Sequence, residues 1–336
     1  MGIIKNLLYK ASNKAMMPLF KNQPIFPYYH LINNNEVKHI KHLYQYKTVN
    51  EFKKDLNFLL KAYKPLNPKH LINSKSPLKI PKNHFLLTFD DGLREIYNII
   101  YPILKTNNLQ AIFFINPNFI DNHDSLYKHD ISIIIDHIIL SKSNGEALRN
   151  VNLILNIDEN SLIQETINSI KALKHTDKNK LNSIARLLDI NIVSYIKNKK
   201  PYLSKTSIER MIDDGFFFGG HTMSHPNLHE LDIENQIKEV IDSIKWLKFN
   251  FNIDYSFFAF PFWDKGISKK VFDSIFEYDN KAVIFGNSGI KKDFHSRVIQ
   301  RFSLEKPSMK TQKVIISENL YKFYNKAIGK YNILRD

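Results

Sequence analysis

The sequence contains no cysteine and only 10 glycines among its 336 residues. The absence of cysteine excludes disulfide bonds and thiolate metal sites, so any bound metal must be held by His, Asp, Glu or carbonyl oxygens. No apolar run approaches the ~18 residues of a membrane-spanning helix, and no secretory hydrophobic region follows Met1. These absences predict a protein that is cytoplasmic or lies peripherally on the inner face of a membrane.

Basic residues outnumber acidic ones: the sequence has 48 Lys and Arg and 33 Asp and Glu, which gives a formal net charge of +15. Such an excess favours anionic partners, namely nucleic acid, phosphorylated substrates or an anionic membrane face. Lysine is spread along the whole chain and no nucleic-acid recognition motif stands out, so we expect no nucleic-acid partner. Residues 1–20 carry three lysines with apolar residues at near-helical spacing. They predict a helix that packs on the protein's own core or, alternatively, contacts an anionic membrane.

Strand-like runs alternate with helical patterns along the chain, which is typical of a parallel α/β fold. The strand-like runs span residues 24–32, 84–89, 111–115, 216–220, 255–260, 281–285 and 297–304. The helical patterns span residues 49–63, 94–107, 207–215, 234–250 and 268–279. Residues 121–203 interrupt this alternation with mostly helical, polar sequence. We interpret them as an insertion or lid within one domain that covers residues 1–336.

Two adjacent carboxylates, Asp90 and Asp91, follow the apolar run 84–89 and precede Gly92. Asp-Gly is also a common hairpin signal, but residues 94–107 have helical spacing in place of a second strand. The pair is therefore expected where a strand feeds a helix, which is where α/β proteins place active sites. Adjacent carboxylates repel, and burial raises the pKa of at least one of them. A bound cation resolves the conflict if one Asp ligates it and the other serves as a base.

A second polar cluster follows the run 216–220 in the stretch FFFGGHTMSHPNLH. His221 and His225 lie four residues apart, and imidazole is the natural metal ligand in a chain without cysteine. Pro226 disfavours helical geometry at His225, so a turn at a strand end, which brings both imidazoles to one point, fits better than a helix. The alternative is two surface histidines in a chain that has 13 of them.

Together the two clusters resemble the first two motifs of the polysaccharide deacetylases, the NodB-homology or carbohydrate esterase family 4 enzymes. The residues that carry the resemblance are TFDDG at 88–92 and HTMSHP at 221–226. PYYHLI, AIFFINPNFI and FFAFPFWD resemble further elements of the family. The resemblance implies an α/β fold, a distorted (β/α)7 TIM-like barrel of the NodB-homology type, with 121–203 as a mostly helical insertion.

The resemblance also implies an activity and assigns roles to individual residues. Asp91, His221 and His225 match the ligands of a divalent metal ion, expected to be Zn²⁺ with Co²⁺ or Ni²⁺ as alternatives. Asp90 matches the base, and the backbone N–H of Phe262 matches a donor to the oxyanion. The implied reaction removes an N-acetyl group from a polysaccharide, an oligosaccharide or a lipid-linked glycan. In it, metal-bound water attacks the amide carbonyl.

The match to the family has gaps, and other residues are candidates to fill them. Ala259 stands where many members carry an Arg that pairs with the base, and Arg301 is a candidate replacement. No clean L-x-H motif supplies an acid for the leaving amine, so His295 and His30 are the candidates, and His30 is also assigned to substrate binding. If neither reaches the site, the leaving group takes its proton from Asp90 or from water.

The third motif departs from the family after Pro261, which we assign to substrate binding. Trp263 replaces the usual Gly, and it is either a platform on which a sugar stacks or a core residue. Two alternatives to N-deacetylation stay open. The first is a non-catalytic glycan-binding relative, against which the intact Asp90 argues. The second is a deacylase or esterase that acts on another acyl group, such as formyl or O-acetyl.

Overall fold

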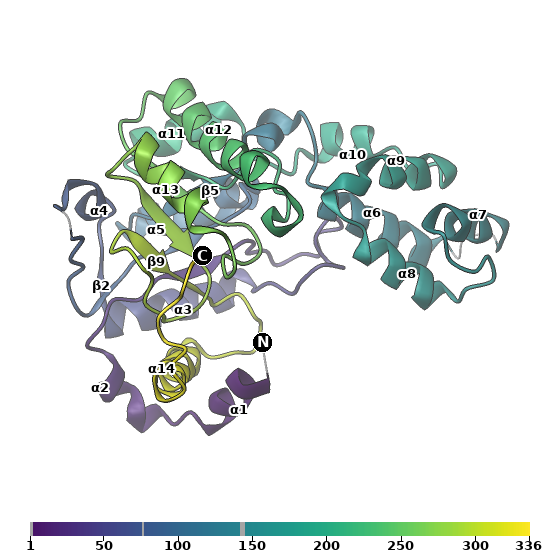
Figure 1. Cartoon of the computed structure of the whole chain (residues 1–336). Helices are drawn as coiled ribbons and strands as arrows, with labels where there is room; N and C mark the ends of the chain where they lie inside the picture. The colour runs from purple at the N-terminus through teal and green to yellow at the C-terminus, as the bar shows by residue number, and fades with distance from the viewer. Residues whose placement is uncertain (1–2, 76, 142–144) are drawn as a thin grey trace.

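The computed structural model describes residues 3–75, 77–141 and 145–336. Its centre is an eight-stranded parallel sheet in the order β10-β1-β4-β5-β6-β7-β8-β9, curved into a nearly closed barrel (Figure 1). The strands are β1 (Pro27–Tyr29), β4 (Thr88–Phe89), β5 (Ile112–Ile115), β6 (Phe217–Gly220), β7 (Phe257–Ala259), β8 (Val283–Gly286), β9 (Val298–Gln300) and β10 (Phe302–Ser303). Every strand-like run of the sequence contributes to this sheet, so the predicted TIM-like barrel is confirmed.

The barrel has seven strand positions because β9 and β10 share one of them. β9 pairs with β8 and β10 pairs with β1, so the stretch 298–303 joins the two edges of the sheet. Arg301 lies between the two short strands and is fully buried. The predicted run 84–89 is also divided: its first half forms β3 (His84–Phe85), which pairs with β2 (Lys64–Pro65) in a separate small sheet.

Helices follow the strands as predicted and cover the barrel (Figure 1). They are α3 (Val49–Ala62), the π-helix η2 (Ile96–Ile100) with α5 (Tyr101–Thr106), α11 (Lys205–Asp213), α12 (Ile233–Phe251) and α13 (Lys269–Tyr278). Local sequence explains where they begin. In α3 the Thr48 side chain accepts the N–H of Glu51 while the Glu51 carboxylate accepts the N–H of Thr48, a reciprocal cap. Asp232 caps α12 without this reciprocity, since its side chain accepts the N–H of Asn235.

The long segment between β5 and β6 is helical and projects from one side of the barrel (Figure 1). It holds η3 (Pro117–Asn122), α6 (Tyr127–Leu140), α7 (Gly145–Leu155), α8 (Ile163–Ala172), η4 (His175–Asp177), α9 (Lys178–Leu187) and α10 (Ile192–Lys199). These helices share an apolar core that includes Ile134, Ile170 and Ile184. At the base of the segment the rings of Phe119 and Tyr202 pack 5.2 Å apart. The helical segment is therefore attached beside the carboxyl ends of β5 and β6.

The N-terminal helix α1 (Ile3–Ala11) lies along α14 (Thr311–Ala327), a helix that the sequence analysis did not predict. Lys5 of α1 forms an ion pair with Glu318 of α14, with Nζ 2.7 Å from Oε1. Packing on the protein explains only part of α1, because the helix buries none of its residues, and Ile3 and Leu7 stay 82% and 60% exposed. Within the described ranges, no helix combines the length and the apolarity needed to cross a membrane.

Candidate functional site

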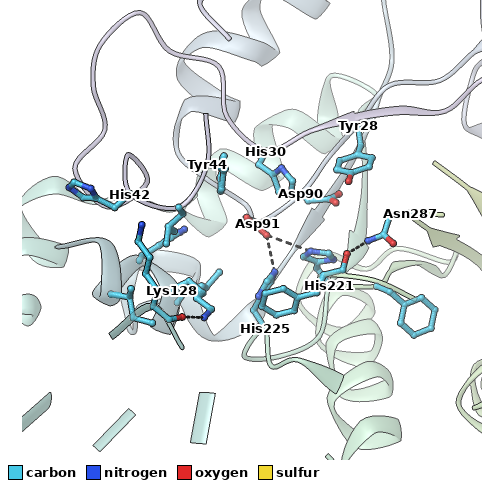
Figure 2. A pocket seen from close by; sticks show the side chains of 17 residues that line it. Tyr28, His30, His42, Tyr44, Asp90, Asp91, Lys128, His221, His225 and Asn287 are labelled. Atoms are coloured by element: carbon cyan, nitrogen blue, oxygen red, sulfur yellow. Dashed lines mark hydrogen bonds and ion pairs between the residues drawn. The ribbon is translucent and has the colours of Figure 1, made fainter. Parts of the chain in front are cut away.

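The aspartates, His221 and Phe262 of the sequence motifs lie at the carboxyl ends of the barrel strands. Asp90 and Asp91 follow β4, His221 follows β6 and Phe262 follows β7. Asn287, which the sequence did not single out, joins them from the end of β8. This is the face on which parallel barrels build their sites from strand-to-helix loops. All of these residues line one cavity of about 410 Å³ (Figure 2). The complete lining is Tyr28, His30, His42, Leu43, Tyr44, Asp90, Asp91, Leu126, Lys128, His129, Ile131, Lys171, His221, His225, Phe260, Phe262 and Asn287.

Asp91, His221 and His225 converge as the sequence predicted. Oδ1 of Asp91 lies 3.5 Å from Nε2 of His221 and 3.2 Å from Nε2 of His225, and a ligand atom from each residue falls within 4.8 Å of the others. All three side chains are buried.

The arrangement of the triad fits a cation. Nδ1 of His221 lies 2.8 Å from the carbonyl oxygen of Ala259, so Nδ1 carries the proton and the lone pair of Nε2 faces Asp91. Oδ1 of Asp91 has no well-directed hydrogen bond within the described part of the chain. A carboxylate oxygen and an imidazole lone pair directed at the same point repel unless a cation lies between them. Two nitrogens and one oxygen suit zinc, and also cobalt or nickel, with a coordination position left open.

The loops that carry the site residues have unusual backbone conformations. Asp91, Thr222, His225 and Phe262 have φ values of 70°, 66°, 56° and 54°. A positive φ is uncommon for residues other than glycine, and each one costs of order 1–3 kcal/mol. Such conformations persist only where the surrounding structure enforces them, so their clustering here indicates that contacts around the site impose its backbone geometry.

Hydrogen bonds hold the histidine loop in this conformation. Oγ1 of Thr222 accepts the N–H of His225 at 3.1 Å. The carboxylate of Glu239, from α12, accepts the backbone N–H groups of Met223 and Ser224 at 2.8 and 3.0 Å. Buried Asn116, after β5, donates to the carbonyls of His221 and Thr222. The loop is thus fixed by elements on both of its sides.

Asp90, beside the triad, is held by Arg301. The guanidinium spans both carboxylate oxygens, with Nη1 2.7 Å from Oδ1 and Nη2 2.9 Å from Oδ2, and it also donates to Oγ1 of Thr88 at 2.8 Å. Burial raises the pKa of Asp90, but the charge of Arg301 outweighs it, and the net pKa is lowered. Asp90 is therefore ionised at neutral pH. Arg301 supplies from the last strand the charge that Ala259 cannot.

His30, at the end of β1, lines the same cavity and pairs with Glu305. Its Nδ1 lies 2.6 Å from Oε2 of Glu305, whose other oxygen accepts the backbone N–H groups of His30 and Leu31. Burial lowers the pKa of His30, but the Glu305 carboxylate outweighs burial and raises the pKa to about 10. His30 is therefore a protonated imidazolium at neutral pH, within the cavity that holds Asp90 and the triad (Figure 2).

Three other predicted residues lie in different settings. His295 is not in the cavity, and its selection as a site residue is wrong: its ring packs 4.4 Å from that of Phe276, and it lines a separate pocket beside β9. Trp263 is 51% exposed, so the interpretation as a core residue is also wrong; its ring stacks on His229, with centroids 5.5 Å apart. Pro261 is buried directly after β7, next to Phe262.

The side of the cavity opposite Asp90 was not predicted from the sequence. Tyr44 comes from the loop after β1, and Lys128 and His129 come from the first turn of α6. Asn287, which donates to the carbonyl of Phe262, was also missed. None of these residues belongs to a spaced motif, so only the three-dimensional arrangement brings them to the site. Of the missed residues, Glu305 alone could have been found from the sequence, because it is an acidic residue directly after the strand-like run 297–304.

Comparison with known proteins agrees with this geometry. The family profile described as polysaccharide deacetylase matches residues 78–134 and 155–283. No curated protein sequence matches the chain.

Solved structures with a similar fold include two named deacetylases. The Streptococcus pyogenes deacetylase PplD, in complex with acetate, has a TM-score of 0.55 at 15% identity, covering 88% of this chain and 98% of that one. BC0361, a polysaccharide deacetylase from Bacillus cereus, has a TM-score of 0.50 at 14% identity, covering 89% and 70%. IcaB from Ammonifex degensii has a TM-score of 0.52 at 12% identity, covering 88% and 97%. At these identities the likeness to solved structures shows the fold alone. The family profile matches more than half of the chain, and this match shows the family. The chain therefore belongs to the polysaccharide deacetylase family, whose activity is the deacetylation of carbohydrates.

Proposed function

We propose that this protein is a metal-dependent hydrolase that removes N-acetyl groups from a carbohydrate. The observation that carries the proposal is one cavity that holds three kinds of group: a buried Asp91–His221–His225 triad, an ionised Asp90 and a protonated His30. Hydrolysis of an amide needs a water molecule whose pKa is lowered, a base that accepts its proton and an acid that protonates the leaving nitrogen. A site that only bound glycans would not need, beside three metal ligands, an ionised carboxylate that does not itself bind the metal.

Asp91, His221 and His225 would hold the metal, which we propose to be zinc, with cobalt or nickel as substitutes. When bound, such a cation lowers the pKa of water from 15.7 to about 7 and polarises a carbonyl oxygen. Asp90 needs that help, because a carboxylate with a lowered pKa is too weak a base for ordinary water.

Asp90 then accepts the proton of the attacking water. The two hydrogen bonds from Arg301 hold the Asp90 carboxylate in one orientation and keep it ionised. The water oxygen bonds to the amide carbon, and the oxyanion that forms is stabilised by a donor. We assign that donor to the backbone N–H of Phe262, whose loop is held by Asn287 through the Phe262 carbonyl.

His30 gives the final proton. When the C–N bond breaks, the nitrogen takes a proton from the His30 imidazolium and leaves as a free amine, while the acyl group leaves as acetic acid, which releases its proton to solvent as acetate. Glu305 keeps His30 charged before this step. Proton exchange with solvent afterwards restores Asp90 to its ionised form and His30 to its protonated form. Deformylation or O-deacetylation would use the same groups, so these two activities are the alternatives that a substrate panel must separate.

Trp263 and Pro261 are assigned to the substrate-binding side. The exposed indole of Trp263, on the loop of Phe262, offers an apolar face on which a pyranose ring can stack.

We also propose that the protein contacts anionic membranes peripherally. Ile3, Leu7 and Leu19 are 82%, 60% and 74% exposed on the N-terminal helices, and Lys10 and Lys14 are exposed beside them. Apolar and basic side chains in one segment favour the surface of an anionic bilayer. Flotation with anionic liposomes is expected for the wild type and not for Leu7→Ser combined with Leu19→Ser. Equal flotation of both proteins would contradict the proposal.

The function is tested by metal content and acetate release measured together. Wild type, Asp90→Asn and His221→Ala are assayed on N-acetylated monosaccharides, oligosaccharides and lipid-linked glycans. We expect metal in the first two proteins only and acetate release by the wild type only. His30→Asn is expected to lose most activity, and the matched control His295→Asn to keep it, because His295 lies outside the cavity. A wild type that binds no zinc, cobalt or nickel after reconstitution would contradict the site. Metal binding without acyl release would favour the glycan-binding alternative.

A further inference from the structure

The cavity has a second wall that the proposed chemistry does not use. Leu126, Lys128, His129 and Ile131, around the first turn of α6, line it together with Lys171 at the end of α8. Figure 2 shows Lys128 and His42 on one side of the cavity and Asp90 and Asn287 on the other. The barrel thus supplies the reacting groups, whereas the helical segment between β5 and β6 supplies the wall that faces them.

Lys128 places a positive charge on this wall without a carboxylate partner. Its Nζ donates to the carbonyl oxygens of Lys171 and Leu173, at 3.0 and 3.2 Å, where α8 ends. An ammonium group has three donors, so one N–H remains. Nζ also lies 4.9 Å from the centroid of the Tyr127 ring, which is neutral, so the charge is not neutralised. Among the described residues, no Asp or Glu oxygen pairs with it. Burial lowers the pKa of Lys128, and the negative charge of Glu230 offsets this only in part.

Lys171 adds a second such charge. It is exposed, it lines the same cavity, and in the described part of the structure its side chain has no hydrogen bond or ion pair. Both lysines line one cavity, so an anion bound there would gain attraction from two positive charges that no carboxylate of the described structure pairs with.

His129 completes the wall with a neutral donor. The Tyr202 hydroxyl accepts the N–H of Leu126 at 2.9 Å, so its own proton points to Nδ1 of His129, 2.7 Å away. The proton of the imidazole must then be on Nε2. Burial holds the pKa of His129 well below its usual range, so the ring stays neutral. The wall therefore presents hydrogen-bond donors and positive charge, and no carboxylate.

We propose that Lys128 and Lys171 form an anion-binding subsite, so that the substrate carries a phosphate or a carboxylate beside its acylated sugar. This inference rests on the proposed function and narrows its substrate class. A cavity of about 410 Å³ lies in the range of small-molecule sites, about 300–1,000 Å³, so the sugar and its anionic group would share one cavity. A charge-assisted hydrogen bond contributes enough that losing one lysine weakens binding roughly 10- to 100-fold.

The test compares charged and neutral sugars on matched variants. The substrates are N-acetylglucosamine 1-phosphate, an N-acetylated aminouronic acid and the neutral methyl glycoside of N-acetylglucosamine. The variants are Lys171→Met, Lys128→Met and the control Lys199→Met, which removes an exposed lysine of the same helical segment. We expect the first two to raise KM about 10- to 100-fold for a charged sugar only, with kcat unchanged. Lys199→Met should match the wild type.

The choice of variant and a separate binding measurement make the test decisive. Lys128→Met removes hydrogen bonds that cap α8 and can affect folding, whereas Lys171→Met breaks no side-chain contact in the described structure, so Lys171→Met is the deciding variant. Calorimetry of the three sugars with Asp90→Asn measures binding without turnover, and thus separates the subsite from the reaction. Tighter binding of the phosphate or of the uronate, lost in Lys171→Met, supports the subsite and identifies the anion. Equal binding of neutral and charged sugars overturns it, even if acetate is released.

Discussion

The ion pair between Arg301 and Asp90 allows a quantitative test, because both partners are buried and one of them is the proposed base. Asp90 is 3% exposed and Arg301 0% exposed, and two hydrogen bonds of 2.7 and 2.9 Å join them. In Arg301→Met the carboxylate keeps its burial and loses its counter-charge. Breaking a buried pair from one side costs about 3–5 kcal/mol of stability, because an uncompensated charge remains.

The pH dependence of this loss follows from the two pKa directions. In the wild type the pKa of Asp90 is lowered, so the pair stabilises the fold above the unfolded-state pKa of about 3.9, and that contribution is lost as the pH falls through the folded-state pKa. In Arg301→Met the largest charge that opposes burial is removed, and only the smaller effects of His221 and His30 still lower the pKa, so we expect the pKa of Asp90 to rise above its unfolded-state value. The folded protein then prefers the protonated carboxyl, and its stability falls as the pH rises above about 3.9.

Urea unfolding of chelator-treated protein between pH 4 and 8 measures both effects. We expect Arg301→Met to lose about 3–5 kcal/mol at pH 7 and less at pH 4. Arg301→Met combined with Asp90→Asn should recover part of the loss, since no charge is then left buried. In the metal-loaded enzyme, the acid limb of the Arg301→Met rate profile should move to higher pH. A loss below about 1 kcal/mol that is the same at every pH would refute the reasoning, because it is the size expected of an exposed pair.

Three further outcomes are expected. Glu305→Gln removes the charge that raises the pKa of His30 to about 10, so the alkaline limb of the rate profile should move to lower pH. In the wild type the His30–Glu305 pair stabilises the fold below about pH 6.5, and this stabilisation is lost as the pH rises through about 10. Glu305→Gln should lack this contribution to stability. Gly220→Ala places a Cβ that clashes with Oγ of Ser243 and should lower stability by about 1–3 kcal/mol in thermal unfolding, with partial rescue by Ser243→Gly. Removal of metal by a chelator should abolish acetate release and lower the melting temperature, and zinc should restore both; unchanged activity without metal would contradict the triad.

Much of the fold was predictable because its signals are local. A parallel barrel strand is buried on both faces and reads as a short apolar run, and the helix after it shows a 3.6-residue period. The triad was predictable for a related reason: Asp91, His221 and His225 directly follow such runs, and parallel strands bring their carboxyl ends to one face. The glycines at 219 and 220 fit the same pattern, since an added Cβ at either would clash with its neighbours.

The partners of these residues were decided by the tertiary structure. Arg301 and Asp90 are 211 positions apart, and His30 and Glu305 are 275 apart. Closing the barrel through residues 298–303 brings both pairs together, and no local spacing encodes that closure. For the same reason His295 was a plausible acid by sequence, although its ring packs against Phe276 outside the cavity.

The strand–helix alternation and the ligands at the strand ends can thus be read from the sequence, because both depend on residues that are neighbours along the chain. Which charges meet the base and the acid, and which side chains of the helical segment face them, follows only from the folded chain. Those choices depend on burial and on contacts between distant segments. Lys128 illustrates this dependence: in the sequence it is one lysine among many, and in the structure it is an unpaired charge on the wall of the cavity.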